Sequence, residues 1–339
     1  MKLVVIADHP TIRSTVEGYL ARVKEIDKCM VDVERVYLSV AYKRNFRKIK
    51  TDLSDKVSVL ELNVFVHFLY IFVICFVSER IFVHSVHNLK KAPAALLFAG
   101  KMIVDLHGLV SVEVSRSKWL YKFLECFVWR HALCVITVTQ TMSDVFDSLF
   151  GYRKKMKIIL PIHCHSPGVK GEIEKSFDLV YSGGIQEWQC IDQVVDLVKK
   201  FPSARVLILS PEIDYFTKIF KNDLHRVSIK YCTGMDYYDS LRRARYGFML
   251  REDIPLNNVA CPTKLIEYLN WGVVPILLSD KIGDFGSLGM KFVLLSEFDY
   301  HNVPSDLEQT LVRDNNYVVV QGLEKLSKNG LLMLRTVLR

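Results

Sequence analysis

Residues 261–278, CPTKLIEYLNWGVVPILL, contain a helix and a buried strand in direct succession. Pro262 suits the first helical position, because its fixed φ angle fits there and its missing N–H would have no helical partner in that turn. Gly272 suits the position just past the end of the helix, where the backbone enters the left-handed region. Residues 273–278 are apolar, as expected of a strand that is buried in a parallel sheet. The segment therefore predicts an α/β fold.

The start of this helix has the features of a phosphate-binding site. Its first N–H groups, on Thr263 and Lys264, have no helical partner and lie at the positive end of the helix dipole. Lys264 adds a full positive charge, and Glu267 lies one turn further along the same face. These groups together suit a nucleotide diphosphate whose ribose lies beside the carboxylate. A well-capped helix of an ordinary α/β protein explains the same residues, so the segment alone leaves both interpretations open.

The same residues resemble the donor-site signature of the retaining GT-B glycosyltransferases of family 4. In the polysaccharide and lipopolysaccharide branch that signature often reads Pro-Thr-Lys-x-x-Glu-Tyr-Leu-x-x-Gly-x-Pro-Val, and residues 251–253 and 257–260 are similar as well. The resemblance implies a GT-B fold, in which two Rossmann-like domains with parallel sheets face each other across a cleft. It also implies a contact between Glu267 and the donor ribose. The broader family has a second Glu eight residues earlier, where this chain has Val259.

Length and composition fit two domains. The chain has 339 residues, of which 50% are hydrophobic, and this is enough for two cores. Its eight cysteines form no CxxC pair and have no histidines at zinc spacing, which predicts reduced thiols in a reducing compartment. Residues 1–8 read as a first strand and not as a signal peptide. We therefore expect a cytoplasmic protein.

Apolar segments alternate with helical patterns along the whole chain, which predicts parallel sheets covered by helices. Strands are expected at 2–7, 32–39, 57–62, 80–84, 102–106, 133–138, 157–161, 178–182, 205–209, 227–231, 246–250, 273–278 and 291–295. Turn-forming residues mark a linker at 165–176. The predicted domains are an acceptor-side domain at 1–164 and a nucleotide-sugar-binding domain at 177–322. A C-terminal helix is expected at 323–339, and packing of this helix against the N-terminal domain is one possibility.

The candidate catalytic residue lies at a strand end. The segment 101–108, KMIVDLHG, is a strand that ends before His107, and Gly108 permits close approach of a ligand to the backbone. It resembles the Asp-x-His-Gly segment of family 4, whose His faces the donor sugar, so the resemblance makes His107 the catalytic candidate. A histidine hydrogen-bonded within a loop is the alternative. Glu113, near an acidic position often found after this segment, and His9, after the first strand, are acceptor-side candidates.

The second domain opens with a strand followed by Gly183 and Gly184, which can let backbone amides approach a phosphate. The segment resembles the family's Tyr-x-Gly-Gly-x-x-x-Trp. Many members then place Arg and Lys where this chain has residues 186–189, QEWQ. We therefore expect Lys264, with Arg251, to supply the positive charge for the diphosphate. Together with Gly234, in a turn that in the family often contacts the base, the donor-binding candidates are Gly183, Gly184, Gly234, Arg251, Thr263, Lys264 and Glu267.

The N-terminal half is basic. Residues 1–165 carry 24 Lys and Arg against 15 Asp and Glu, a net charge of +9, whereas residues 166–339 have a net charge of −1. The basic residues concentrate at 43–50, at 153–157 and at Arg116, Lys118 and Lys122. This pattern favours an anionic partner, either a membrane surface or a lipid-linked diphosphate. No recognition motif supports nucleic acid, and a solvated basic face is the alternative for each cluster.

Residues 63–77, NVFVHFLYIFVICFV, are the most apolar stretch. About fifteen residues are fewer than the ~20 that cross a bilayer. We expect a buried or interfacial helix and no transmembrane span.

The resemblance to family 4 implies a retaining glycosyltransferase that moves a sugar from a nucleotide diphosphate donor to a bacterial surface glycan, with a lipid-linked glycan as the expected acceptor. It would lie on the inner face of the cytoplasmic membrane as a peripheral protein. No cofactor and no metal is expected, because the resemblance implies that helix N–H groups and a cation stabilise the leaving diphosphate. A catalytically inactive GT-B subunit that binds a partner is one alternative. A GT-B sugar-nucleotide epimerase is the other, although its additional acidic groups are not evident here.

Overall fold

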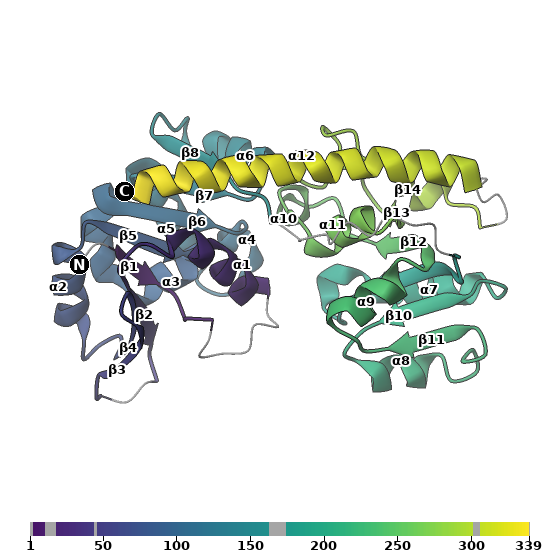
Figure 1. Cartoon of the computed structure of the whole chain (residues 1–339), viewed down its shortest axis with the longest axis horizontal. Helices are drawn as coiled ribbons and strands as arrows, with labels where there is room; N and C mark the ends of the chain where they lie inside the picture. The colour runs from purple at the N-terminus through teal and green to yellow at the C-terminus, as the bar shows by residue number, and fades with distance from the viewer. Residues whose placement is uncertain (1–2, 11–17, 44–45, 163–173, 301–305, 339) are drawn as a thin grey trace. The chain divides into compact units, whose positions relative to one another are not determined.

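The structure, a computed structural model, describes residues 3–10, 18–43, 46–162, 174–300 and 306–338. The chain divides into two compact units (Figure 1). Unit 1 consists of Met1–Pro161 and Leu326–Arg339, and unit 2 of Ile162–Lys325. Most of the predicted linker, 165–173, lies outside the described residues.

Unit 1 contains an eight-stranded sheet in the order β3-β4-β2-β1-β5-β6-β7-β8. All neighbouring strands pair in parallel except β3 and β4, which are antiparallel. Every residue of β1, β6 and β7 is buried, as expected of central strands that helices cover on both faces. The strands are β1 (Leu3–Ile6), β2 (Arg35–Ala41), β3 (Ile49–Ser54), β4 (Val57–Asn63), β5 (Arg80–His84), β6 (Met102–Leu106), β7 (Cys134–Thr137) and β8 (Met156–Ile159).

Helices connect these strands. They are α1 (Gly18–Asp27), α2 (Phe68–Val77), α3 (Ser85–Lys91), α4 (Val110–Glu113), α5 (Lys118–His131) and α6 (Gln140–Phe150), with 3-10 segments η1 (Lys28–Met30) and η2 (Pro93–Lys101). One face of the sheet is covered by α1 and by the end of the last helix, α12 (Asp306–Leu338). Leu334 and Leu338 of α12 join the core formed by Val5 and Ile26, which explains why the last residues belong to unit 1.

Unit 2 contains a six-stranded sheet in the order β11-β10-β9-β12-β13-β14, and all its strands are parallel. The strands are β9 (Phe177–Ser182), β10 (Val206–Leu209), β11 (Val227–Lys230), β12 (Ala244–Met249), β13 (Val274–Leu277) and β14 (Val293–Leu294). The helices are α7 (Ile191–Lys200), α8 (Ile213–Ile219), α9 (Gly234–Leu241), α10 (Pro255–Asn258) and α11 (Thr263–Asn270), with 3-10 segments η3 (Glu187–Gln189) and η4 (Leu295–Glu297).

The α/β fold with two parallel-rich sheets confirms the sequence prediction, and every expected strand is present within a few residues. Strand β3 was not predicted, because all six of its side chains are exposed and it therefore has no apolar pattern. Helix α12 begins at Asp306, well before the expected start at residue 323. The seven cysteines within the described residues are free, and the eighth, Cys164, lies outside them.

Two expectations about the segment 261–278 have different outcomes. Gly272 has a φ angle of +67°, which confirms the left-handed turn after α11. Pro262 is not the first helical residue, because its ψ angle of 124° is extended and the helix begins at Thr263. It is the residue that precedes the helix, and its carbonyl accepts from the N–H groups of Leu265 and Ile266.

The apolar stretch at 63–77 forms α2 only from Phe68 onward, after a turn. Within the part of the chain that the structure describes, no helix is both long enough and apolar enough to cross a membrane.

Gly330 is required by packing within unit 1, although glycine is unfavourable in the interior of a helix such as α12. A Cβ atom at this position would lie 2.6 Å from the carbonyl oxygen of Ile159. We predict that Gly330→Ala lowers the free energy of unfolding by about 1–3 kcal/mol. Gly322→Ala is the matched control in the same helix, since its Cβ would meet nothing within 4 Å. The control should be stabilising by up to ~1 kcal/mol. Urea unfolding measures both, and equal stabilisation by the two variants would disprove the packing argument.

Candidate functional site

The order of the strands in unit 2 identifies one edge as a binding position. From β9 the chain continues to β10 and β11 on one side, and then returns to β12, β13 and β14 on the other. In open parallel sheets ligands bind beyond the carboxyl ends of the strands at such a switch point. Ser182 is the last residue of β9, and Arg251 follows β12 by two residues.

A hydrogen-bonded network at this edge joins α9 and α11 to β9. The Tyr237 hydroxyl donates to Oε2 of Glu267 at 2.7 Å and lies 2.8 Å from Oγ of Ser182. The Nζ atom of Lys264 lies 3.0 Å from the same Oε2 and 4.4 Å from the centre of the Tyr237 ring. Burial, and then the Glu267 charge, raise the pKa of Tyr237 well above its ordinary value, so it remains a hydrogen-bond donor.

The network leaves specific atoms available to a ligand. Both contacts of Glu267 fall on Oε2, so Oε1 has no partner among the described residues. At the start of α11 the first N–H groups with backbone partners are those of Leu265 and Ile266. The N–H groups of Thr263 and Lys264 are the ones that precede them. The Lys264 side chain is 40% exposed, whereas that of Glu267 is 9% exposed. A cation, a carboxylate oxygen and helix N–H groups therefore lie together on α11.

Tyr268 fixes the position of α11 against the sheet. It is fully buried, and its hydroxyl accepts from the N–H of Ser182 at 3.1 Å and donates to the carbonyl of Phe248 at 3.3 Å. Gly247 makes room for the ring, because a Cβ at this position would lie 2.5 Å from it. The Tyr268 hydroxyl thereby links the helix that carries Lys264 to the strand end that precedes Gly183.

The turn at Gly183 and Gly184 follows Ser182 directly. The Tyr181 hydroxyl donates to the carbonyl of Gly184 and lies 2.6 Å from Oε1 of Gln189, and these contacts hold the turn in place. Burial lowers the pKa of Arg251, and the interactions with Cys190 and Tyr181 oppose this shift only in part. No carboxylate among the described residues forms an ion pair with Arg251, so its charge is available to an anion.

Gly234 has a φ angle of +62° and is the first residue of α9, three positions before Tyr237. A residue with a side chain would be strained in this conformation. The glycine thus permits the turn from which α9 presents Tyr237 to Glu267.

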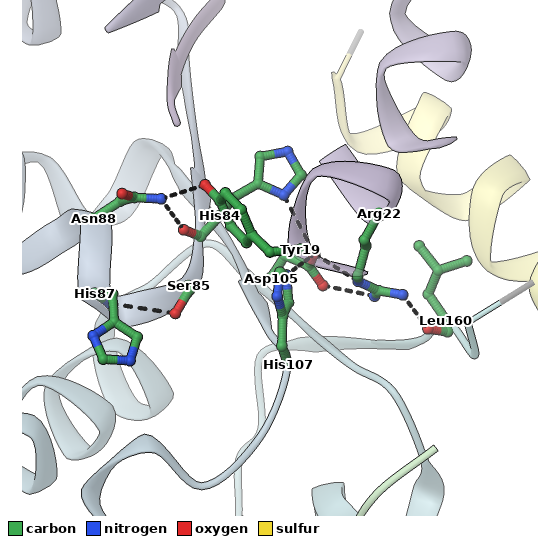
Figure 2. A network of polar contacts seen from close by, with 9 residues as sticks. All are labelled: Tyr19, Arg22, His84, Ser85, His87, Asn88, Asp105, His107 and Leu160. Atoms are coloured by element: carbon green, nitrogen blue, oxygen red, sulfur yellow. Dashed lines mark hydrogen bonds and ion pairs between the residues drawn. The ribbon is translucent and has the colours of Figure 1, made fainter. Parts of the chain in front are cut away.

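In unit 1 the polar groups gather at the carboxyl ends of β5 and β6 (Figure 2). Asp105, on β6, is fully buried, and Arg22 of α1 donates to both of its oxygens at 2.7 and 2.8 Å. Arg22 also donates to the carbonyl of Leu160 at 3.1 Å. Burial would raise the pKa of Asp105, but the Arg22 and His107 interactions outweigh it and hold the pKa well below its ordinary value. The carboxylate is therefore ionised and accepts only.

His107 follows β6 directly, as the sequence predicted, and its Nε2 lies 2.6 Å from Oδ2 of Asp105. Since the ionised carboxylate can only accept, Nε2 carries the proton of this hydrogen bond. In the neutral ring Nδ1 is then a lone-pair acceptor. The side chain of His107 is 21% exposed.

His84, the last residue of β5, lies against the same carboxylate. It is fully buried, and its Nδ1 lies 3.4 Å from Oδ2 of Asp105 without the alignment of a hydrogen bond. Burial lowers the pKa of His84 and outweighs the opposing effect of Asp105. Its ring is therefore neutral at pH 7.

His84, Asp105 and His107 form the one group within the described residues whose side chains could hold a metal ion. The chemistry of the group does not favour a cation, because the Arg22 guanidinium already pairs with both oxygens of Asp105. A divalent ion would meet that positive charge at short range. The group suits the orientation of His107 better than metal binding.

The acceptor-side candidates lie in different surroundings. His9 is 6% exposed, and its ring packs edge-on against Tyr37 with 4.6 Å between the ring centres. Burial lowers the pKa of His9. Glu113 is exposed at the end of α4. The contacts of His9 are those of a core residue, whereas Glu113 is accessible.

The sequence did not identify Arg22, Ser182 or Tyr237 as members of either network. All three are brought to their partners by tertiary folding, and no spacing pattern relates Tyr237 to Glu267 thirty residues later. Glu125 of α5 was missed for the same reason. It is buried, which raises its pKa, and its Oε1 accepts from the N–H of Ser111 at 3.1 Å, just beyond His107.

Comparison with solved structures identifies the fold. The Anabaena protein HepE in complex with UDP is similar with a TM-score of 0.70 and 12% identity, over 99% of this chain and 100% of that chain. The chain has the GT-B fold. Sucrose-phosphate synthase from Thermosynechococcus elongatus matches with a TM-score of 0.66 and 11% identity, over 99% of each chain. An α,α-trehalose-phosphate synthase (UDP-forming) from Burkholderia vietnamiensis matches with a TM-score of 0.63 and 12% identity, over 99% of this chain and 100% of that chain. No protein-family model and no curated protein sequence matches.

The neutral His84 makes the stability of this GT-B chain depend on pH. Below about pH 6.5 the unfolded chain protonates the residue, whereas the folded chain resists protonation, so stability is lost as the pH falls through this value. We predict that His84→Gln loses less unfolding free energy between about pH 8 and pH 5.5 than the wild type does. Because pH 5.5 lies about one unit below the ordinary histidine pKa, the difference should approach but not exceed about 1.4 kcal/mol. Burial also lowers the pKa values of His9 and His87, but both residues are present in the two proteins, so their effects cancel in the comparison. An equal loss in the two proteins would show that His84 is not responsible.

Proposed function

We propose that the chain is a retaining glycosyltransferase that takes its sugar from a nucleotide diphosphate donor held at the switch point of unit 2. The observation that carries this proposal is the Lys264, Glu267 and Tyr237 network at the start of α11. It combines an anion-binding helix start with a carboxylate at the edge where parallel sheets bind ligands. The structures of HepE with UDP-glucose, and with UDP and glucose, support such a ligand for this fold. The resemblance to family 4 supports the same assignment.

Each group has a role in donor binding. Oε1 of Glu267 accepts from a ribose hydroxyl while Oε2 is held by Tyr237 and Lys264. The diphosphate binds the N–H groups of Thr263 and Lys264, with Lys264 and Arg251 supplying the positive charge. The turn at Gly183 and Gly184 brings backbone close to the phosphates. These groups stabilise the negative charge that develops on the leaving diphosphate, so the step needs no metal ion.

Transfer proceeds with retention at the anomeric carbon. The bond between this carbon and the diphosphate oxygen breaks, and a bond to the acceptor oxygen forms on the same face. The proton of the acceptor hydroxyl passes to the departing phosphate. His107 orients the sugar, with Nε2–H fixed by Asp105 and Nδ1 accepting from a sugar hydroxyl.

The acceptor is a lipid-linked bacterial surface glycan, and the enzyme works on the cytoplasmic side of the membrane as a peripheral protein. This part of the proposal is supported by the family-4 signature and by the basic character of residues 1–165. Arg116, Lys118 and Lys122 are exposed around the start of α5, where they can meet phosphate groups of an anionic surface.

A catalytically inactive GT-B subunit is the second candidate. It is favoured by Val259, which is fully buried at the position of the family's first Glu. The absence of Arg and Lys from residues 186–189 favours it as well. Hydrolysis or transfer of a nucleotide sugar by the purified chain distinguishes an enzyme from such a subunit.

Replacing the two charged residues of α11 separates their roles in donor binding. We predict that Lys264→Ala weakens the binding of a nucleotide sugar far more than the binding of the free nucleoside, because the nucleoside has no diphosphate. Glu267→Ala should weaken both by about 1.5–3 kcal/mol, since each contains the ribose. Calorimetric titration measures these affinities, with Lys218→Ala, an exposed lysine of α8, as the control. Unchanged donor affinity in both variants would remove α11 from the binding site.

His107→Ala tests the proposed reaction centre. We predict that turnover is abolished while donor affinity and melting temperature change little, because the interaction belongs to the transition state. His131→Ala, an exposed histidine at the end of α5, is the control. Turnover, donor affinity and melting temperature are measured on the same preparation. Near-normal turnover per folded molecule would show that His107 is a structural loop residue.

A further inference from the structure

Helix α2 and the turn before it expose apolar side chains to solvent. Seven of these residues are between 41% and 75% exposed. They are Phe65, Val66, Phe68, Leu69, Val73, Phe76 and Val77. A contiguous apolar surface of this kind marks a site that contacts a protein or a membrane.

The exposed residues form a continuous stripe. Leu69, Val73 and Phe76 are spaced four and three positions apart and therefore share the outer face of the helix. The opposite face is buried through Ile71 and Ile74. A surface helix of a water-soluble protein normally has polar residues on its outer face. Helix α2 is apolar on both faces. Because the side chains of its outer face are exposed, no other element among the described residues covers that face.

The segment η2 extends this surface. Phe98 packs against Phe72 and Phe76, with 5.2 and 6.2 Å between ring centres. Leu97 beside it is 72% exposed. We refer to residues 65–77 together with Leu97 as the α2 surface.

Polar contacts at both ends hold the α2 surface in place. At the start, Oδ1 of Asn63 accepts from the N–H groups of Phe65 and Val66. At the end, Nζ of Lys101 donates to the carbonyls of Phe76 and Ser78 at 2.8 and 2.9 Å. The apolar side chains are thus presented by a fixed element of the fold.

The rim of the α2 surface is basic. Nζ of Lys48 donates to the Tyr70 hydroxyl at 3.2 Å and lies over the Tyr70 ring, and Lys101 lies at the other end of the helix. Residues 63–101 contain four Lys and Arg and a single acidic residue, Glu79. An apolar face with a positive rim is complementary to a bilayer that contains anionic lipid.

We propose that the α2 surface inserts into the boundary between the headgroups and acyl chains of an anionic bilayer, with Lys48 and Lys101 at the lipid phosphates. A helix of ten residues is about 15 Å long, about half of the bilayer core. It therefore lies in the plane of the membrane. This inference rests on the peripheral membrane association proposed above and is independent of sugar transfer.

Vesicle sedimentation tests the proposal. The probes are vesicles of phosphatidylcholine alone and of phosphatidylcholine with phosphatidylglycerol, at low and at high salt. Wild type should bind the anionic vesicles best and retain part of this binding at high salt, because salt screens charges and not apolar insertion. The double variant Leu69→Asp, Val73→Asp should lose the salt-resistant binding by at least about tenfold. Both residues are exposed, so folding should persist, and the melting temperature verifies this.

Two further variants sharpen the result. Leu311→Asp, Val318→Asp replaces apolar residues of α12 that are 63% and 65% exposed, and should bind vesicles as wild type does. Lys118→Glu, Lys122→Glu should lose only the salt-sensitive share. Equal binding by wild type and the α2 variant would overturn the role of the α2 surface while leaving membrane association intact. Absence of binding by wild type would overturn both.

Sedimentation velocity tests the alternative that a second copy of the chain binds the α2 surface. If wild type dimerises, the α2 variant is monomeric and neither binds vesicles, a second copy of the chain covers the surface and the proposal is wrong. Titration with nucleotide sugar is run on the same variants. If the wild type does not bind nucleotide sugar, the proposed glycosyltransferase function is wrong, but the proposal for the α2 surface is unaffected.

Discussion

The central strands of both sheets are buried on both faces, and this confines polar chemistry to the strand ends. Within the described parts of the chain, the two polar networks lie at the carboxyl ends of β5 and β6 and of β9 and β12. Asp105 carries a charge although it lies within β6 and is fully buried. A buried charge of this kind is tolerated only when it is paired and hydrogen-bonded. The two hydrogen bonds from Arg22 satisfy that requirement. Because the carboxylate is ionised, it accepts from Nε2 of His107, and Nδ1 is left as the acceptor nitrogen of the neutral ring.

The second network obtains its charge balance in a different way. The family signature often provides Arg and Lys after the double glycine, but this chain has Gln186 and Gln189 there. The remaining cations of that edge are Lys264, held by Glu267, and Arg251, without a carboxylate partner among the described residues. In the proposed function, the diphosphate balances the charge of Arg251 and binds the N–H groups at the start of α11. The Tyr237 hydroxyl donates to Oε2 of Glu267, and in the proposed function the donor ribose binds the other oxygen, Oε1.

Local patterns in the sequence were enough to predict the strands, the left-handed turn at Gly272 and the position of His107 after β6. Buried parallel strands are continuous apolar runs, and glycine is the residue that a left-handed turn requires. Strand β3 escaped prediction because its exposed side chains leave no pattern. Arg22 and Tyr237 escaped because their partners are distant along the chain, and only the packing of α1 and α9 brings them together. The outer face of α2 could not be distinguished from a buried one, since burial depends on whether another element covers it.

The most direct test of the central claim is a thermal-shift panel of nucleosides, nucleotides and nucleotide sugars on the wild-type chain. A ligand that binds only the folded state stabilises it by mass action, by about 2.7 kcal/mol at a concentration one hundred times its dissociation constant. The account predicts that at least one nucleotide diphosphate or its sugar raises the melting temperature, and that the corresponding nucleoside does so much less. If no nucleotide diphosphate raises the melting temperature at saturating concentration, unit 2 does not hold the proposed donor.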